Sequence, residues 1–580
     1  MRDEEKKRRK GPGVLRPALG ALNGVLAGCA ALAVAELVAA GVRPQSGPVV
    51  AVGGAAIDRT PTAVKDWAIR RFGTDDKLVL QLGILAVLTL LALALGVLAA
   101  RYRRTGSAGV LLFGVVGAAA ATGRPDSIGV PDALPSAAGA VAGALLLYAL
   151  TGRLPAAAPP REDTRGTREE DTRGTPDDDG RGVPDDDTPG AGPVAAPAAS
   201  PSAPERPERP EGTEGPEGWD RRGFVLAATA AAAASAVVGA AGRALNASSG
   251  RGAVASRARV VLPRPGSPAR PLSPRTGPRI SGLSPFVTPN ADFYRVDTAL
   301  VVPKVDAGDW RLRIHGKGVR RPAVLSFDDL LRRELIERDI TLTCVSNEVG
   351  GPYAGNARWI GVRLADLLTE CGVRPPSRGG PADQMVSRSV DGMTIGTPVG
   401  DVLDGRDAML AVGMNGEPLP FAHGFPVRMV VPGLYGYVSA CKWLQDIELT
   451  TFDSYDPYWV QRGWSQRAPV KTESRIDTPK PFARPKAGTV MVAGVAWAQH
   501  RGIDKVEVRI DDGPWQQARL AAEDTRDTWR QWSFPWQATR GSHTLAVRAT
   551  DRTGRTQTAR RAQVVPDGAT GWHTVVVNVD

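Results

Sequence analysis

The sequence has few of the residues that most often bind metals or cross-link chains. Its 580 residues include four cysteines, too few for a disulfide framework, and no C-x-x-C pair for zinc, a c-type haem or an iron–sulfur cluster. All five histidines lie outside the long apolar runs. A haem inside a membrane needs imidazole ligands on its helices, so we expect no haem there.

The charge distribution does not favour nucleic-acid binding. The net charge is +11, but the arginines crowd the edges of apolar runs and the stretch 251–279, whereas 161–189 is mixed and rich in aspartate. No basic face with interleaved aromatic residues is evident. An anionic lipid or an anionic substrate accounts for these arginines more simply.

Residues 1–153 are predicted to be a membrane region with about four transmembrane helices. The second run is long and uncharged, which strongly indicates a membrane span. The third and fourth are short and rich in glycine and alanine, so a buried hairpin is the alternative for them. The four apolar runs are 17–42, 78–100, 108–121 and 137–150.

A tether and a fifth apolar run follow. Residues 154–220 are rich in proline and aspartate and cannot bury a core, which predicts a disordered linker. Residues 221–245 then contain a fifth transmembrane helix, which begins with Arg221 and Arg222 in the sequence RRGFVL. The pair resembles the twin-arginine export signal. An ordinary positively charged flank is the alternative.

The basic residues predict the orientation of the chain. Lysines and arginines at positions 6–9 and arginines at positions 101–104 favour the cytoplasmic side, so five crossings leave the remainder outside. Four basic residues between positions 65 and 77 oppose this scheme mildly. We therefore expect a multi-pass cell-membrane protein with its catalytic domain on the extracytoplasmic side, joined by a second linker at 246–277.

The sequence pattern changes at about Pro278, after the last of the long apolar runs. Residues 278–480 alternate short β-type runs with an amphipathic helix, which predicts a mixed α+β domain. Residues 481–580 alternate apolar and polar positions between turns, which is typical of an immunoglobulin-like sandwich. Its tryptophans are expected in the core and at interfaces; they are Trp497, Trp515, Trp529, Trp532 and Trp536.

Cys344 is the cysteine best placed for chemistry. It ends the strand-like run DITLTC and opens into a glycine-rich polar loop, so its thiol can face a cleft. By itself this pattern favours a buried structural cysteine. Cys371 and Cys441 are expected to be small buried hydrophobic residues.

Three further segments carry a family resemblance: TLTCVSN, NARWIGVRLADLL and MNGEPLPFAHGFPVRMVVPGLYGYVSACKWL. From about Pro278 to its C-terminus, the chain resembles the sulfite oxidase family of molybdopterin-dependent oxidoreductases, in a bacterial membrane-anchored branch. The resemblance implies a molybdenum–molybdopterin cofactor. It also implies that the C-terminal sandwich is a dimerisation domain, which allows a homodimer.

The resemblance assigns roles to individual residues. Cys344 matches the metal-binding cysteine, and a thiolate is a soft ligand suited to molybdenum. His423 and Arg428 match the pair that holds the terminal phosphate of the pterin, for which a guanidinium is well shaped. The other expected cofactor contacts are Ser439, Lys442, Asn347, Asn290 and Tyr294.

The sequence also departs from the sulfite oxidase pattern. Arg295 and Arg501 match two arginines that hold an oxyanion near the metal, but Val349 stands where another arginine is expected. Trp464 replaces a tyrosine, and an indole donates a hydrogen bond but cannot exchange a proton. These changes predict a weaker anion pocket, in which a neutral S- or N-oxide fits as well as sulfite.

The sequence therefore predicts an extracytoplasmic oxidoreductase that performs two-electron oxygen-atom transfer. Its expected partners are a small oxyanion or an S- or N-oxide, an unidentified external electron carrier and the lipid bilayer. The alternative is a catalytically degenerate module that is tethered to the membrane for binding or scaffolding. The combination of Cys344 with His423 and Arg428 favours the enzyme, because a scaffold needs neither a soft ligand nor a phosphate grip.

Overall fold

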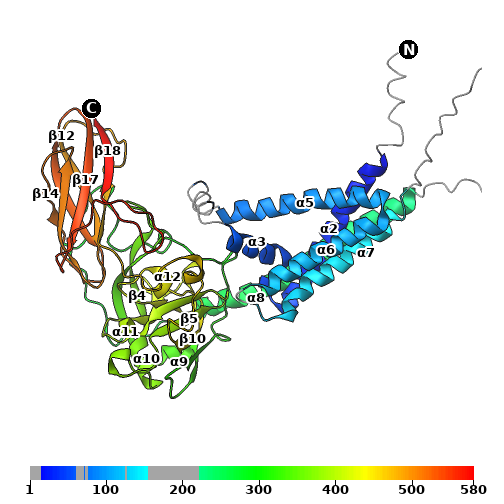
Figure 1. Cartoon of the computed structure of the whole chain (residues 1–580), viewed down its shortest axis with the longest axis horizontal. Coiled ribbons are helices and arrows are strands. Elements are labelled where there is room, and N and C mark those ends of the chain that lie inside the picture. The colour runs from blue at the N-terminus through cyan, green and yellow to red at the C-terminus, as the bar shows by residue number, and fades with distance from the viewer. Residues whose placement is uncertain (1–14, 61–63, 65–70, 72–75, 125–126, 155–220) are drawn as a thin grey trace, which may run out of the picture.

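The computed structural model describes residues 15–60, 64, 71, 76–124, 127–154 and 221–580. A bundle of long helices stands at one end, a mixed α+β domain follows it, and a β-sandwich lies at the far end (Figure 1). The predicted tether from residue 155 to 220, the basic N-terminus and most of the stretch 65–75 lie outside the described residues.

Five of the described helices are long and apolar enough to cross a membrane. They include the third and fourth predicted spans, which form full helices of the bundle. The five are α2 (Leu15–Val42), α5 (Asp76–Arg101), α6 (Arg103–Thr122), α7 (Leu134–Thr151) and α8 (Arg221–Arg259). The shorter helices of this region are η1 (Pro44–Ser46), α3 (Pro48–Arg59) and η3 (Val130–Ala133).

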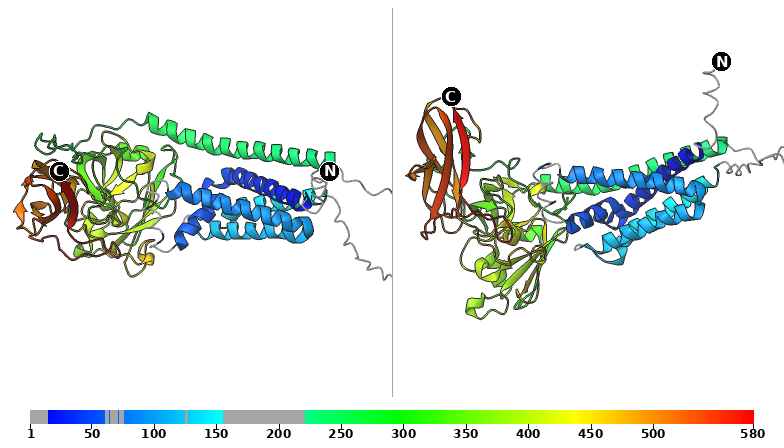
Figure 2. Two further views of the ribbon diagram at one scale, coloured as in Figure 1. Left: turned by 90° about the horizontal axis from the view of Figure 1, so that it is seen from above. Right: turned by 45° about the horizontal axis from the view of Figure 1, so that its top comes forward.

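The long helices run alternately toward and away from the α+β domain, and α8 ends beside it (Figure 2). Helix α8 continues to Arg259, so the part of the predicted second linker from 246 to 259 is helical. Alanine and arginine, which dominate this stretch, are strong helix formers that outweigh Gly250 and Gly252. The short helix α3 was not predicted, because its two adjacent glycines read as a turn.

Small residues allow α2 and α5 to approach backbone to backbone. Gly20, Gly24 and Gly28 recur every fourth residue and so share one face of α2. A Cβ atom on Gly24 would lie 1.9 Å from the carbonyl oxygen of Ala92, and one on Gly96 would lie 2.1 Å from that of Gly20. This is the close packing that small residues at four-residue spacing permit between membrane helices.

The α+β domain contains two five-stranded sheets. In the first, the order is β2-β1-β10-β5-β6, and β1 and β10 run parallel. In the second, the order is β3-β4-β7-β8, and β9 pairs with β7. The strands are β1 (Arg311–Gly316), β2 (Ala323–Ser326), β3 (Leu335–Thr343), β4 (Ala354–Arg363), β5 (Gln384–Ser389), β6 (Thr394–Pro398), β7 (Met409–Met414), β8 (Glu417–Pro418), β9 (Arg428–Val430) and β10 (Leu444–Thr450).

Short helices connect these strands and close the domain. The predicted amphipathic helix is α10, whose leucines are buried, and a capping box between Ser326 and Asp329 begins α9. Cys371 and Cys441 are buried, as predicted. The helices are α9 (Phe327–Leu331), α10 (Leu364–Glu370), α11 (Val399–Val402), α12 (Gly436–Ser439), η4 (Pro376–Arg378), η5 (Phe421–His423) and η6 (Val460–Arg462).

Two four-stranded antiparallel sheets form the C-terminal sandwich, in the orders β11-β12-β16-β15 and β14-β13-β17-β18. Strand β11 pairs with β12 although it precedes the predicted boundary at 481. The sequence does not predict β11 as a strand because most of its residues are polar. The strands are β11 (Glu473–Thr478), β12 (Gly488–Trp497), β13 (Ile503–Ile510), β14 (Gln516–Gln517), β15 (Arg519–Leu520), β16 (Arg530–Ala538), β17 (Gly541–Asp551) and β18 (His573–Val579).

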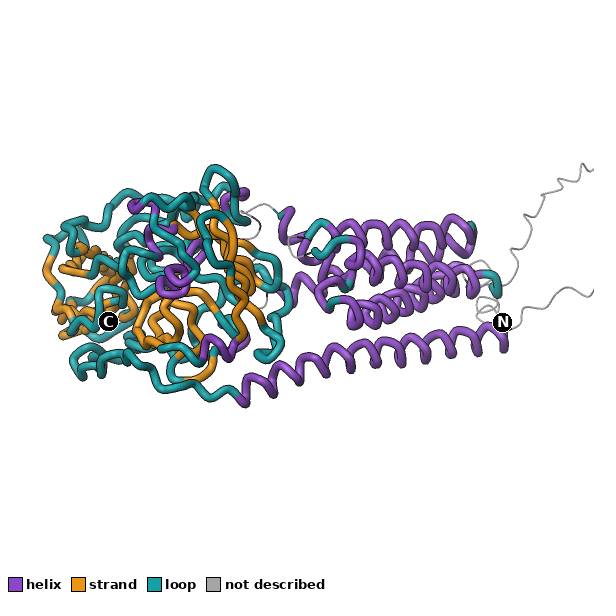
Figure 3. The backbone as a smooth tube through the Cα atoms, turned by 90° about the horizontal axis from the view of Figure 1, so that it is seen from below, coloured by secondary structure: helices purple, strands orange, loops and turns teal. Residues whose placement is uncertain are grey.

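The sandwich tryptophans occupy two kinds of site. Trp532 and Trp536 are buried in the core of the sandwich, whereas Trp497 and Trp529 belong to the hydrophobic core of the α+β domain. Trp515 is half-buried and packs edge-on against Trp572, with 4.8 Å between ring centroids. The two domains therefore share a packed interface. Figure 3 shows the strands of both domains at the end of the molecule away from the N-terminus.

Gly24→Leu should destabilise the helical bundle, because a leucine there must push α2 away from α5. Overpacking of this kind costs about 1–3 kcal/mol. The measurement is thermal unfolding of the detergent-solubilised full chain, with Gly41→Leu as control, since a Cβ on Gly41 of the same helix meets no atom within 4 Å. Equal unfolding midpoints for the two variants would contradict the close approach.

Candidate active site

Cys344 stands where β3 opens into the predicted loop. Its side chain is 8% exposed, and its backbone N–H donates to the carbonyl oxygen of Tyr353 at 2.9 Å. Asn347 closes the same loop, because its Oδ1 accepts from the Tyr353 N–H at 2.8 Å. Burial raises the pKa of the Cys344 thiol, so a bound cation is needed to hold it as a thiolate at neutral pH.

Arg428 begins β9 and is 4% exposed. Its Nη1 donates to the carbonyl oxygen of His423 at 3.2 Å, and its guanidinium lies 4.9 Å from the ring centroid of Trp359. Its Nε is buried without a hydrogen-bond partner, and no carboxylate among the described residues pairs with it. Burial lowers its pKa to about 10. A buried cation in this position requires an anion.

Further positive charge gathers around His423. Burial, together with the charges of Arg428, Lys442 and Arg295, lowers the pKa of His423 to about 4. Its Nε2 lies 2.9 Å from the carbonyl oxygen of Asn290, while its Nδ1 is buried without a partner. An anion at this point would bring neutralising charge and an acceptor for these atoms.

Tyr294 is within electrostatic reach of both the thiol and the guanidinium. Burial raises the pKa of its hydroxyl, the charge of Cys344 raises it further and that of Arg428 lowers it, which places the ring within electrostatic reach of both. It stacks on Phe293 with ring centroids 5.2 Å apart. The structure therefore brings Cys344, Tyr294, His423 and Arg428 together.

Other predicted contacts are held by the protein itself. Lys442 Nζ donates to Asp297 Oδ2 at 2.9 Å and to a backbone carbonyl. The Ser439 hydroxyl donates to two carbonyl oxygens of its own turn, and Asn290 Nδ2 donates to Glu417 Oε1 at 2.7 Å. Ser439 and Asn290 thus have backbone groups, rather than their engaged side chains, to offer a ligand.

The residues matched to an oxyanion pocket are arranged less favourably. Arg295 lies 3.6 Å from Asp297, and Arg501 Nε donates to Asp551 Oδ2 at 2.8 Å. Among the described residues, Arg501 forms no hydrogen bond or ion pair with the Cys344 loop. Trp464 is buried beside Tyr437, with 5.6 Å between ring centroids, and its indole N–H has no partner.

Two sandwich residues that the sequence analysis did not select hold the Cys344 loop. Gln499 Nε2 donates to the carbonyl oxygen of Thr341 at 3.0 Å and to Thr343 Oγ1 at 2.9 Å, at the end of β3. Arg475 Nη1 donates to the carbonyl oxygen of Gly351 at 2.9 Å. No linear motif marks either residue, because each contacts the loop across more than a hundred positions.

A buried acid was also missed. Glu473 is 4% exposed and begins β11, and its Oε1 has no hydrogen-bond partner. Burial raises its pKa to about 8, against smaller opposing effects of the Lys471 charge and of a hydrogen bond from Asn347. Glu473 therefore carries a proton at neutral pH beside the Cys344 loop.

The part of the chain that contains this site is similar to known oxidoreductases. The family model "Oxidoreductase molybdopterin binding domain" matches residues 299–459. An uncharacterized oxidoreductase, YuiH of Bacillus subtilis (strain 168), is 33% identical over 162 residues, which are 28% of this chain and 75% of that protein. Mitochondrial sulfite oxidase of Rattus norvegicus is 30% identical over 309 residues, 46% of this chain and 55% of that protein.

The chain belongs to the sulfite oxidase family of molybdopterin-dependent oxidoreductases. It spans about half the length of the mammalian sulfite oxidases that it matches. Nitrate reductase [NADH] 1 of Oryza sativa subsp. japonica is 34% identical over 196 residues, 30% of this chain and 21% of that protein. The sulfane dehydrogenase SoxCD from Paracoccus pantotrophus aligns with 24% identity and a TM-score of 0.44, over 51% of this chain and 84% of that one.

Membership of the sulfite oxidase family implies a molybdenum–molybdopterin cofactor, and the residues present fit one. Arg428 Nε and His423 Nδ1 are buried polar atoms that a phosphate would satisfy. The Cys344 thiol is a soft ligand for molybdenum. Tyr294 is within electrostatic reach of both Cys344 and Arg428. The same set has no evident purpose in a domain that binds no anion, since an unpaired buried guanidinium is costly.

Arg428→Ala should release the cofactor, because the phosphate would lose its buried partner at a cost of about 2–5 kcal/mol. The measurement is pterin and molybdenum content per chain after extensive dialysis. The exposed Arg484→Ala variant is the control and should keep a full complement. Full retention by Arg428→Ala would count against the phosphate grip.

Glu473→Gln should change how stability depends on pH. The folded-state pKa of about 8 exceeds the ordinary 4.5, so the folded state retains a proton that the unfolded state loses. The free energy of unfolding of the parent therefore falls as pH rises from about 5 to 8, relative to the glutamine variant. Thermal unfolding midpoints at pH 5 and pH 9 measure this difference. Parallel pH profiles for the two proteins would refute the raised pKa.

Proposed function

We propose that this chain is a membrane-anchored molybdopterin-dependent oxidoreductase that performs two-electron oxygen-atom transfer on the extracytoplasmic side. The observation that carries the proposal is the buried, unneutralised Arg428 guanidinium beside His423. Tyr294 is within electrostatic reach of Arg428 and of the Cys344 thiol, and Lys442 is within reach of that thiol. A scaffold would have to retain the costly charge of Arg428 without using it.

Each residue has a defined task in this proposal. When bound, the cofactor supplies the two-electron redox change. Cys344 provides the thiolate ligand, while His423 and Arg428 hold the pterin phosphate. The cofactor would extend from the Cys344 thiolate to the phosphate at His423 and Arg428. Along this length it would meet Tyr294, Lys442, Asn347 and backbone groups of Asn290 and Ser439.

The reaction balances in either direction. Reduction of an S-oxide takes two electrons and two protons and yields a sulfide and water. Oxidation of sulfite consumes water and yields sulfate, two protons and two electrons. An external electron carrier supplies or accepts the electrons in each case. Glu473, whose pKa burial raises to about 8, is a buried acid near Asn347 that can deliver or receive a proton.

The site favours a neutral S- or N-oxide over sulfite. Arg295 and Arg501 lie against Asp297 and Asp551, which neutralise them, and Val349 replaces a third arginine. The unpartnered indole N–H of Trp464 can donate to an oxide oxygen, but it brings no positive charge to neutralise a doubly charged anion. The relatives named for sulfite and for nitrate indicate that this type of domain accommodates oxygen on different central atoms.

Several features support the membrane anchor and its orientation. The five long helices alternate in direction, so that the N-terminal end of α2 and the α+β domain lie at opposite ends of the bundle (Figure 1). Arginines at 101, 103 and 104, at the end away from the domain, favour the cytoplasmic side. In this proposal the C-terminal sandwich is immunoglobulin-like, as its two packed sheets suggest, and allows a homodimer.

Cys344→Ser should abolish turnover, because a hydroxyl is a harder and much less acidic ligand than a thiol. The variant is assayed in both directions, for reduction of a dialkyl sulfoxide by a reduced viologen and for oxidation of sulfite by ferricyanide. Cys371→Ser, remote at the end of α10, is the matched control and should retain activity. Normal turnover by a fully loaded Cys344→Ser protein would sink the catalytic assignment.

Replacing Arg221 and Arg222 with lysine should strand the soluble domains in the cytoplasm. A cofactor buried between domains must be inserted before export, so the domain has to cross the membrane folded, and a paired arginine suits that route. The readout is cleavage by protease added outside intact cells. If the paired-lysine variant is cut like the parent, the dipeptide is only a charged flank.

A further inference from the structure

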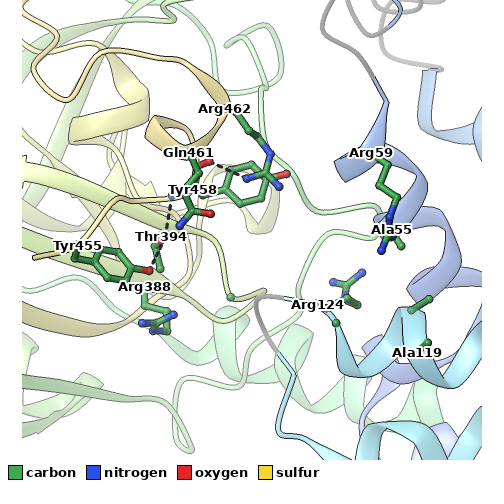
Figure 4. Close-up of a pocket in the computed structure, with 13 residues that line it drawn as sticks. Ala55, Arg59, Ala119, Arg124, Arg388, Thr394, Tyr455, Tyr458, Gln461 and Arg462 are labelled. Carbon is green, nitrogen blue, oxygen red and sulfur yellow. Dashed lines mark hydrogen bonds between the residues drawn. The ribbon is translucent and has the colours of Figure 1, made fainter.

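Four arginines from distant parts of the chain converge on a cavity between the helical bundle and the α+β domain. Its volume is about 500 Å³, within the range of about 300–1,000 Å³ typical of ligand sites. Figure 4 shows Arg59 and Arg124 on the helix side, facing Arg388 and Arg462 on the domain side. Among the described residues that line it, none is acidic.

The two helix-side arginines end membrane helices. Arg59 is the last residue of α3, and Arg124 follows α6 and donates to the carbonyl oxygen of Val50 at 3.3 Å. A cation at a helix C-terminus is favourable in itself, because it opposes the helix dipole. These two residues alone would not indicate a ligand.

The domain-side arginines differ from each other: Arg462 ends the three-residue helix η6, whereas Arg388 lies on a strand and has no helix dipole to oppose. Arg388 lies on β5, is half-buried and forms no ion pair with a carboxylate of the described residues. Arg462 is oriented by Tyr458: its guanidinium lies 3.5 Å from the ring centroid and its Nη1 donates to the carbonyl oxygen of that tyrosine at 2.8 Å. Its orientation is thus set before any ligand arrives.

Neutral polar groups complete the domain side of the cavity. The Tyr455 hydroxyl donates to Thr394 Oγ1 at 3.3 Å, and the Tyr458 N–H donates to the same oxygen at 3.1 Å. Small side chains, among them Ala55, Ala119 and Ala120, leave the helix side open. A cleft lined by charge of one sign concentrates counter-ions, and guanidinium groups grip phosphate oxygens in pairs.

We propose that this cavity binds a phosphate-bearing anion that clamps the α+β domain onto the helical bundle. The headgroup of an anionic phospholipid fits the position of the cavity at the ends of α3 and α6, where a membrane surface would lie. A free phosphate compound has the same chemistry. Only the lipid source rests on the membrane anchoring proposed above, and no part of the proposal depends on the redox reaction.

The test measures ligand-dependent stabilisation of the full chain. Delipidated protein in detergent is titrated separately with short-chain phosphatidylglycerol, with short-chain phosphatidylcholine and with inorganic phosphate, and the thermal unfolding midpoint is followed. Phosphatidylglycerol should stabilise saturably and phosphatidylcholine, which has no net charge, much less. Equal stabilisation by inorganic phosphate alone would assign the cavity to a soluble anion instead.

Variants tie the binding to the cavity. Arg388→Ala and Arg59→Ala should each weaken the apparent affinity by about tenfold, the loss of one charge-assisted hydrogen bond. The exposed Arg332→Ala and Arg484→Ala, both outside the cavity, should leave it unchanged. Because Arg59 is an exposed residue at a helix end, its variant tests binding without endangering the fold.

Two results would overturn the proposal. One is the absence of saturable stabilisation by either phosphatidylglycerol or inorganic phosphate. The other is an equal apparent affinity in the arginine variants and in both controls. Membrane anchoring is judged separately, by whether the parent chain sediments with membranes, so a soluble chain that still binds phosphate would refute the lipid source and not the anion site.

Discussion

The arrangement of the soluble part depends on one costly element, the buried guanidinium of Arg428. It is 4% exposed, its pKa is lowered by burial, and no described carboxylate neutralises it. In a folded protein such a charge is retained where a ligand supplies the opposite charge. His423 stands beside it with a second unpartnered atom, and Tyr294 reaches from it toward Cys344. In the proposed function, the phosphate end of the cofactor lies at Arg428 and His423 and the metal end at Cys344.

Residues of the sandwich hold the Cys344 loop in position. Gln499 and Arg475 hold the two ends of the Cys344 loop, while Glu473 places a protonated acid beside it. Trp497 and Trp529 pack into the α+β core. The Cys344 loop is therefore held between two domains. Any assembly formed through the sandwich would also act on the Cys344 loop.

The sequence predicted the elements whose pattern is local. Apolar length gave the long helices, short alternating runs gave the β-rich character of residues 278–580, and the segment that contains His423 and Arg428 has a characteristic pattern. What it could not predict depends on tertiary contacts. The buried state of Glu473 and the role of Gln499 arise across domains, β11 is polar in composition, and α8 continues through glycines because alanine and arginine around them favour helix. The engaged side chains of Ser439 and Asn290 likewise became evident only from their hydrogen bonds.

The central claim is that the Arg428 and His423 pair holds a molybdenum–pterin phosphate whose metal is bound by Cys344. The most direct measurement is the molybdenum and pterin content of the full chain, purified from cells that load their other molybdenum enzymes. The account predicts equimolar molybdenum and pterin phosphate per chain. A folded chain that contains neither, isolated from such cells, would contradict it.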